Sequence, residues 1–156
     1  MLEATTHAFS RDYTLKDQGV EVGYLQQSMW KEKAELTLGA YSYTMYHNGV
    51  MSGDYCIEMN GAVLADAHKS TWRHNYEIDC AEGHFSLKRR SMWNNDYTVL
   101  VNGQEIGYIS RQSAWKRNAV AEVPGVSPVI SFFFLWLVII SWQEEQAAAA
   151  STAAVN

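Results

Sequence analysis

The sequence predicts a mainly β fold with one α-helix, in which a closed twelve-stranded β-barrel encloses a hydrophobic C-terminal helix. Two observations support this prediction. The run VISFFFLWLVIISW at residues 129–142 is apolar on every side, so a helix formed by it has to be surrounded by the rest of the chain. Before this run, strand-like segments repeat at a constant interval, which indicates an architecture built from similar units.

The start of the helix is marked by Ser127, which suits the N-cap, and by Pro128, which suits the first helical position. A helix over residues 129–142 would be about 21 Å long, and a membrane span needs roughly 20 apolar residues. A buried core helix is therefore expected. The polar residues 143–145 indicate its end. We expect a single domain over residues 1–143 with its helix at about 128–143, and a polar, Ala-rich tail over 144–156 that either extends the helix or frays.

The repeat is clearest where a tyrosine opens a strand and a glycine closes it. The segments YTLKDQG, YCIEMNG and YTVLVNG begin at Tyr13, Tyr55 and Tyr97, which are evenly spaced along the chain. Asn-Gly pairs between such segments are typical of hairpin turns. Each unit reads as roughly four short strands. The third unit ends early, and a strand within residues 3–9 would replace its missing strand, which gives about twelve.

Three architectures fit repeats of this size. A propeller needs roughly four to eight blades, and a β-trefoil fills its centre with side chains and leaves no room for the helix. A twelve-stranded barrel is wide enough to hold a helix. The small residues Gly23, Ala65 and Gly107 occupy equivalent positions and would let the helix approach the barrel wall.

Several segments, taken in their order, are similar to those of a known family. They are GAVLADAHK at 61–69, YEID at 76–79, residues 97–109, and Val123-Pro124 followed by the Phe-rich helix after Pro128. In these segments the chain resembles the tubby C-terminal-like superfamily, nearest its LURP-one-related and phospholipid-scramblase-like branches. The resemblance covers about residues 13–142 and implies a twelve-stranded barrel around a central C-terminal helix.

The function implied by this resemblance is carried over only in part. Tubby proteins bind phosphoinositides through basic residues, and that set has no position-by-position match in this chain. Scramblase-like proteins carry a calcium-binding acidic segment beside the terminal helix, whereas residues 123–128 contain no Asp or Glu.

Composition limits the remaining function classes. A chain that is 47% hydrophobic is not intrinsically disordered, and a net charge of −5 argues against a nucleic-acid partner. The N-terminus lacks the basic and apolar regions of a signal peptide, so we expect a cytoplasmic protein, as a monomer. Cys56 and Cys80 show no metal or redox spacing and are expected to be reduced thiols.

No catalytic motif was found in the sequence, which has no nucleophile elbow, P-loop, dinucleotide fingerprint or HExxH motif. We therefore expect neither enzymatic activity nor a cofactor. Asp79 and His84 flank a turn and are the weak candidates for a metal site, since both are possible zinc ligands. An ordinary polar hairpin is the favoured interpretation.

Each repeat also places a basic residue after a tryptophan. If equivalent positions recur at one level of the barrel, one rim would carry all three sets. Trp favours the membrane interface, and each cation near anionic lipid contributes roughly 1 kcal/mol. Peripheral docking of this rim on an anionic phospholipid surface is one hypothesis, and the run Lys88-Arg89-Arg90 could serve the same surface. The favoured alternative is that the Trp rings cover the barrel end and the cations are solvated. The rim residues are Trp30, Lys31, Trp72, Arg73, Trp115, Lys116 and Arg117.

The sequence thus predicts a non-enzymatic binding or adaptor module of undefined ligand, whose partner is an anionic lipid surface or another protein. Two alternatives stay open. The first is a membrane-inserted, scramblase-like protein that uses the C-terminal helix as an anchor. The second is a carrier whose barrel holds an apolar ligand, which requires the helix to leave a cavity.

Overall fold

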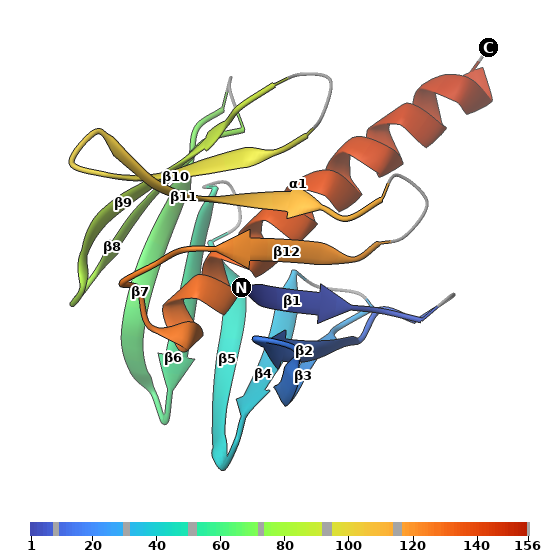
Figure 1. The fold of residues 1–156 in the computed structure, drawn as a ribbon. Coiled ribbons are helices and arrows are strands. Elements are labelled where there is room, and N and C mark those ends of the chain that lie inside the picture. The colour runs from blue at the N-terminus through green and yellow to red at the C-terminus, as the bar shows by residue number, and fades with distance from the viewer. Residues whose placement is uncertain are drawn as a thin grey trace.

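The chain forms a closed antiparallel barrel of twelve strands with a single helix running through it (Figure 1). The computed structural model describes residues 1–7, 10–29, 32–49, 53–71, 74–91, 95–113 and 117–155. The helix is α1 (Pro128–Val155). The strands are β1 (Leu2–Thr5), β2 (Tyr13–Asp17), β3 (Val20–Gln27), β4 (Lys33–Leu38), β5 (Tyr41–Asn48), β6 (Asp54–Met59), β7 (Ala62–Lys69), β8 (Tyr76–Cys80), β9 (Gly83–Arg89), β10 (Tyr97–Val101), β11 (Gln104–Arg111) and β12 (Ala119–Glu122).

Each strand pairs with its neighbours in sequence, and β1 closes the barrel against β12, with Leu2 opposite Ala121. Closure leaves no unpaired sheet edge. The predicted fold class is confirmed, including the N-terminal strand that completes the set of twelve.

The repeat recurs in the backbone geometry. The pairing register shifts after Leu15, Ile57 and Val99, which are equivalent positions of the three units. The turn that follows has positive φ at both central residues in every unit, for example 52° at Asn60 and 82° at Gly61. This is the signature of a type I′ hairpin turn, whose twist matches that of the flanking strands. The predicted turn at Gln18-Gly19 has the same geometry.

The glycines at equivalent positions of the repeat allow adjacent strands of the barrel wall to approach each other closely. A Cβ built on Gly23 would lie 1.8 Å from the carbonyl oxygen of Thr37, and one on Gly107 would lie 2.0 Å from that of Glu122. These carbonyls belong to the neighbouring strands β4 and β12. The expectation that these glycines make room for the helix is therefore wrong, because the close approach is between adjacent strands.

The first half of α1 fills the barrel. All residues from Ile130 to Trp142 are buried, and the inward-facing side chains of the strands pack around them. Phe134 lies 5.3 Å from Phe85 between ring centroids, and Trp136 meets Tyr55 edge-to-face at 5.9 Å. Burying a large apolar side chain contributes about 1.5–3 kcal/mol, so the buried side chains of this helix contribute substantially to core stability.

The start of α1 is tied to the wall by Ser127. Its carbonyl accepts the first helical hydrogen bond from Ser131 at 2.9 Å, so Ser127 occupies the predicted N-cap position. Its backbone N–H donates to the Glu82 carboxylate at 2.8 Å, and its hydroxyl donates to the other oxygen of that carboxylate. Because Glu82 lies in the β8–β9 turn, the helix start is fixed to one end of the barrel.

The helix does not end at residues 143–145. It continues to Val155, and residues 146–155 are exposed beyond the barrel (Figure 1). The segment expected as a tail therefore extends the helix. By length and composition α1 could span a membrane, but 72% of its most apolar window is buried in the barrel.

Candidate functional site

The two ends of the barrel differ in their connections. At the end where α1 begins, successive strands are joined by two-residue turns. At the end where α1 leaves, called the mouth here, the connections between strands contain five to seven residues. Longer connections carried by a rigid barrel are the usual position of binding residues, so the mouth is the candidate site.

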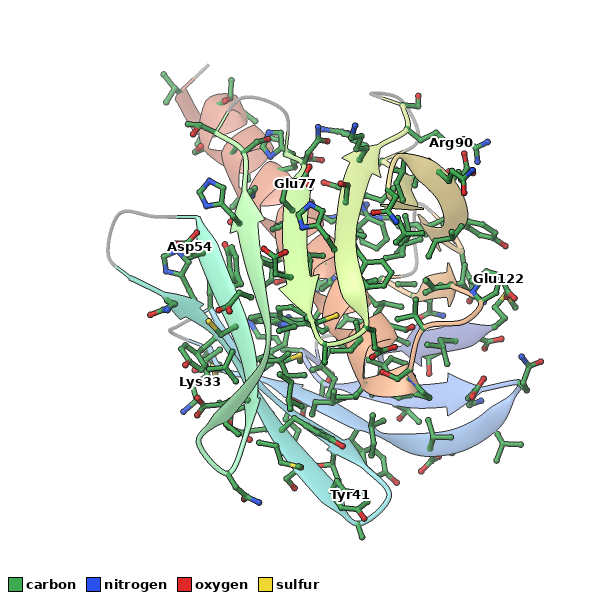
Figure 2. The ribbon with its side chains drawn as sticks, turned by 90° about the vertical axis from the view of Figure 1, so that its left-hand side faces the viewer. Lys33, Tyr41, Asp54, Glu77, Arg90 and Glu122 are labelled. Atoms are coloured by element: carbon green, nitrogen blue, oxygen red, sulfur yellow. The ribbon has the colours of Figure 1, made fainter. Side chains whose placement is uncertain are left out.

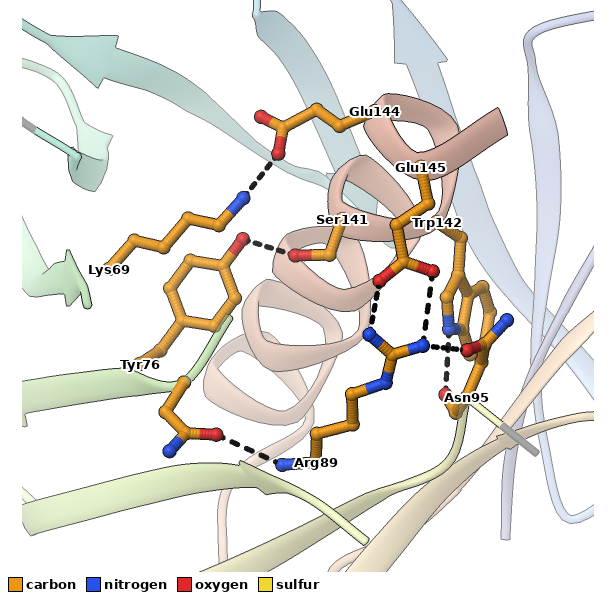
Figure 3. A network of polar contacts seen from close by, with 9 residues as sticks. Lys69, Tyr76, Arg89, Asn95, Ser141, Trp142, Glu144 and Glu145 are labelled. Atoms are coloured by element: carbon orange, nitrogen blue, oxygen red, sulfur yellow. Dashed lines mark hydrogen bonds and ion pairs between the residues drawn. The ribbon is translucent and has the colours of Figure 1, made fainter. Parts of the chain in front are cut away.

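Four consecutive helix residues, Trp142–Glu145, form a polar collar where α1 passes through the mouth. Successive residues of a helix point about 100° apart, so four in a row face the wall in all directions. The partners come from different parts of the wall (Figure 3). Gln143 donates to Gln27 on β3, Glu144 accepts from Lys69 on β7, Glu145 accepts from Arg89 on β9, and Trp142 donates to the carbonyl of Asn95 between β9 and β10.

Both carboxylates of the collar are neutralised by cations that are themselves largely buried. The Lys69 and Arg89 side chains are only 13% and 19% exposed. Arg89 Nη1 lies 2.7 Å from Glu145, and its other terminal nitrogen donates to the side-chain oxygen of Asn95. Charged hydrogen bonds in such partly dry surroundings are stronger than those at an open surface. The collar therefore fixes the depth of the helix in the barrel.

Just inside the collar, Tyr76 joins the wall to the helix. Its hydroxyl donates to the carbonyl of Leu137 at 3.0 Å, so the Ser141 hydroxyl, 2.7 Å away, is the donor in their shared bond. Burial raises the pKa of the Tyr76 phenol well above its usual value. Ser141 was one of two polar residues in the predicted apolar helix, and this contact explains how it is buried.

The collar also has an aromatic contact. The Arg111 guanidinium lies 4.6 Å from the centroid of the Trp142 ring, a distance typical of a cation–π interaction. Burial lowers the pKa of Arg111, but a guanidinium stays charged at neutral pH.

Positive charge is concentrated at the mouth. Leaving out Lys31, Arg73 and Lys116, which lie outside the described residues, nine of the twelve Lys and Arg residues remain. Only Lys16 lies away from the mouth. The other eight are in the mouth connections or within two residues of them. They are Arg11, Lys33, Lys69, Lys88, Arg89, Arg90, Arg111 and Arg117.

Five of these eight cations are exposed: Arg11, Lys33, Lys88, Arg90 and Arg117. Figure 2 shows Arg90 projecting outward from the end of β9. The opposite end is acidic, with carboxylates in or beside its turns. By the same criterion as for the cations, these are Asp17, Glu21, Glu58, Asp79, Glu82, Glu105 and Glu122. The mouth also holds Asp12, Glu32, Asp54, Glu77 and Asp96 besides the two collar glutamates, so among the described residues it is close to neutral while the opposite end is strongly negative.

The predicted rim can be placed only in part. Trp30, Lys31, Trp72, Arg73, Trp115 and Lys116 lie outside the described residues, so their arrangement stays a prediction. Arg117 is described and is exposed at the mouth. In the predicted basic run, Lys88 and Arg90 are exposed, whereas Arg89 turns inward to Glu145. The run is therefore not a uniform charged surface.

Asp79 and His84 do lie together, on the outer face of the barrel, as their positions around a turn suggested. His84 Nδ1 is 2.7 Å from Asp79, and Nε2 is 2.8 Å from Glu77. Hydrogen bonds donated by the ring to these two carboxylates, Asp79 first, raise the pKa of His84. Because each ring nitrogen already faces a carboxylate, the arrangement favours an imidazolium ion. Within the part of the chain that the structure describes, no group of three or more His, Cys, Asp or Glu side chains could hold a metal ion.

A cavity of about 250 Å³ opens at the mouth between α1 and the ends of β3 and β4. Glu32 and Glu144 line it, together with Arg11 and Lys33. Partial burial and the neighbouring Glu144 carboxylate raise the pKa of Glu32, although a 2.9 Å hydrogen bond from the Tyr55 hydroxyl opposes this shift. Sequence reasoning missed both the cavity and the collar.

Comparison of the chain with protein-family models, with curated proteins and with solved structures finds no match.

Proposed function

We propose that this chain is a non-enzymatic binding module that docks peripherally, through its mouth, on an anionic phospholipid surface. The observation that carries the proposal is the segregation of charge: eight of nine described Lys and Arg residues belong to the mouth, and five of them are exposed. A surface of this kind orients the protein toward a negatively charged partner over a distance set by ionic screening.

The expected affinity follows from the exposed cations. At about 1 kcal/mol for each basic side chain near an anionic membrane surface, five would contribute at most about 5 kcal/mol, and the exposed carboxylates of Asp12 and Glu32 in the same connections oppose them. Such binding is reversible and depends on ionic strength. Lys31, Arg73 and Lys116 belong by sequence to connections β3–β4, β7–β8 and β11–β12, so they would add to this attraction.

The exposed part of α1 projects from the mouth, so it would lie close to the membrane surface on which the mouth docks. Residues 146–155 would extend about 15 Å, which is half of the roughly 30 Å hydrocarbon core. They carry no charge, and the hydroxyls of Ser151 and Thr152 donate to the carbonyl of Ala148 at 2.9 and 3.0 Å. Contact of this segment with lipid would therefore bury no charged side chain.

The resemblance to the tubby-like superfamily stays a proposal beside this one. It implies the architecture of a barrel around a C-terminal helix, and phosphoinositides are anionic lipids. In the membrane-inserted alternative, α1 would have to leave the barrel and break the collar. In the carrier alternative, α1 would have to leave a cavity inside the barrel for an apolar ligand, where residues 130–142 of the helix are buried. No specific contact favours either of these.

The test is binding to vesicles after removal of charge at the mouth. The triple variant Lys88→Gln, Arg90→Gln, Arg117→Gln removes three exposed cations that form no ion pair within the described residues. We expect it to lose at least tenfold in affinity for anionic vesicles. Lys16→Glu changes the net charge by a similar amount away from the mouth and is expected to bind normally. Equal binding by the triple variant and the unmodified protein would reject the proposal. Substituting Lys31, Arg73 and Lys116 by Gln tests the predicted rim separately.

A further inference from the structure

The docking proposal uses only the two cations among the residues that line the mouth cavity. Its floor is apolar, formed by the buried Trp136 and Ile140, one turn apart on α1. Above the floor lie two carboxylates, Glu32 and Glu144, and two cations, Arg11 and Lys33. A hollow that combines an apolar floor with a few converging polar groups is the usual form of a small-molecule site.

Three of the charged side chains in the cavity, Glu32, Glu144 and Arg11, already form hydrogen bonds within the protein, and some of their donors and acceptors remain for a ligand. Glu32 accepts from the Tyr55 hydroxyl, and Glu144 accepts from Lys69. The two carboxylates also share a hydrogen bond with each other, which requires a proton between them. Arg11 uses Nη1 to donate to the carbonyl of Met29 at 3.1 Å, which fixes the side chain and leaves its other N–H groups.

We propose that this cavity binds a small zwitterion, namely a free α-amino acid with an aliphatic side chain. Its ammonium group would replace the proton that Glu32 and Glu144 share, its carboxylate would face Arg11 and Lys33, and its side chain would rest on Trp136 and Ile140. The ligand carries both charges because the cavity does. A ligand of only one sign would leave two like charges facing it.

The volume limits the ligand. Sites for drug-sized molecules occupy roughly 300–1,000 Å³, and about 250 Å³ at the mouth suits a smaller molecule. The position of Glu144 on α1 and of Glu32 beside β4 also means that the ammonium group would bridge helix and wall. Binding is therefore expected to add to the contacts of the collar.

The experiment is a titration of the isotope-labelled full chain with leucine, followed by NMR. We expect saturable shifts of the backbone amides of Glu32, Lys33, Gln143 and Glu144. N-acetylleucine lacks the ammonium group and leucinamide lacks the carboxylate. Each is expected to bind at least tenfold more weakly, because a charged hydrogen bond contributes about 1.5–3 kcal/mol. Glycine lacks the aliphatic group and is expected to bind more weakly than leucine.

Glu32→Gln is expected to reduce leucine affinity at least tenfold. The matched control is Glu35→Gln, on the adjacent β4, whose carboxylate bonds to Thr44 outside the cavity and whose loss should leave binding unchanged. No saturable shift with leucine, or equal binding of N-acetylleucine, would overturn the proposal without relying on any variant. Because Glu32→Gln keeps Lys88, Arg90 and Arg117, its vesicle binding is expected to persist, so this proposal and the docking proposal fail independently.

Discussion

Arg89, the last residue of β9, forms a two-point contact with Glu145 on α1, with N–O distances of 2.7 and 3.4 Å between the guanidinium and the two carboxylate oxygens. The two residues are 56 positions apart, and both side chains are less than one quarter exposed. Their contact joins wall and helix at the mouth, so it is the clearest test of the collar.

Arg89→Met is expected to destabilise the fold by about 1.5–3 kcal/mol, because it leaves the largely buried Glu145 without its cation. The measurement is urea denaturation of Arg89→Met, Glu145→Gln and the double variant. The double variant should be less destabilised than the sum of the singles. Additive effects would show that the pair does not couple helix and wall.

Removing the Tyr76 hydroxyl is expected to cost about 1 kcal/mol, because Tyr76→Phe leaves the buried Ser141 hydroxyl without its acceptor. Tyr41→Phe is the matched control, since Tyr41 is 62% exposed and its variant should be neutral. Equal unfolding free energies for the two variants would contradict the described contact.

Gly107→Ala is expected to destabilise the protein by about 1–3 kcal/mol or more, because the new Cβ would overlap the Glu122 carbonyl and push β11 from β12. The equivalent residue of the second repeat, Ala65, already carries a Cβ, so Ala65→Gly is the control and should be mild. A melting temperature unchanged by Gly107→Ala would contradict the strand spacing described above.

The raised pKa of Glu32 predicts a dependence of stability on pH. The folded state holds this proton more tightly than the unfolded chain, so its stabilising effect is present at low pH. It is lost as pH rises from the ordinary value of 4.5 through the raised one. Glu32→Gln should remove this dependence and raise the free energy of unfolding slightly at neutral pH, by well below 1 kcal/mol, because solvent screens the site. A steeper decline of stability with pH in Glu32→Gln would contradict this.

The raised pKa of His84 has the same sign of effect. Its imidazolium is held by Asp79 and Glu77, so the stabilisation is complete below pH 6.5 and is lost as pH rises through the raised value. NMR titration should place the pKa of His84 above 6.5, and Asp79→Asn should lower it. A pKa of His84 that is not raised in the unmodified protein would contradict the described contacts with Asp79 and Glu77.

The barrel was predictable because its signals are local and repeated. Evenly spaced tyrosines with Asn-Gly turns after them indicate strand pairs, and the apolar run at 129–142 indicates what the barrel encloses. The end of the helix was not predictable in this way. Residues 143–145 resemble a helix terminus because they are polar, but their polar side chains bond to strand residues at the mouth.

The collar was not predictable because its partners are distant in sequence: Lys69 and Glu144 are 75 residues apart, and no local pattern pairs them. The position of the cations at the mouth, in contrast, could be predicted from the sequence. Once the strands are counted, alternate connections fall at the same end, and nearly all Lys and Arg residues belong to that set. The predicted Trp–cation rim used only part of this pattern.

The most direct measurement is flotation of the unmodified protein, purified without detergent, with neutral and with anionic vesicles at low and high salt. The proposal predicts flotation with anionic vesicles alone, reversed by salt, because exposed cations at the mouth act through screened charge. Flotation that resists high salt would contradict it and would indicate insertion of α1. No flotation from folded protein would also contradict it, and the acidic partner would then have to be a protein.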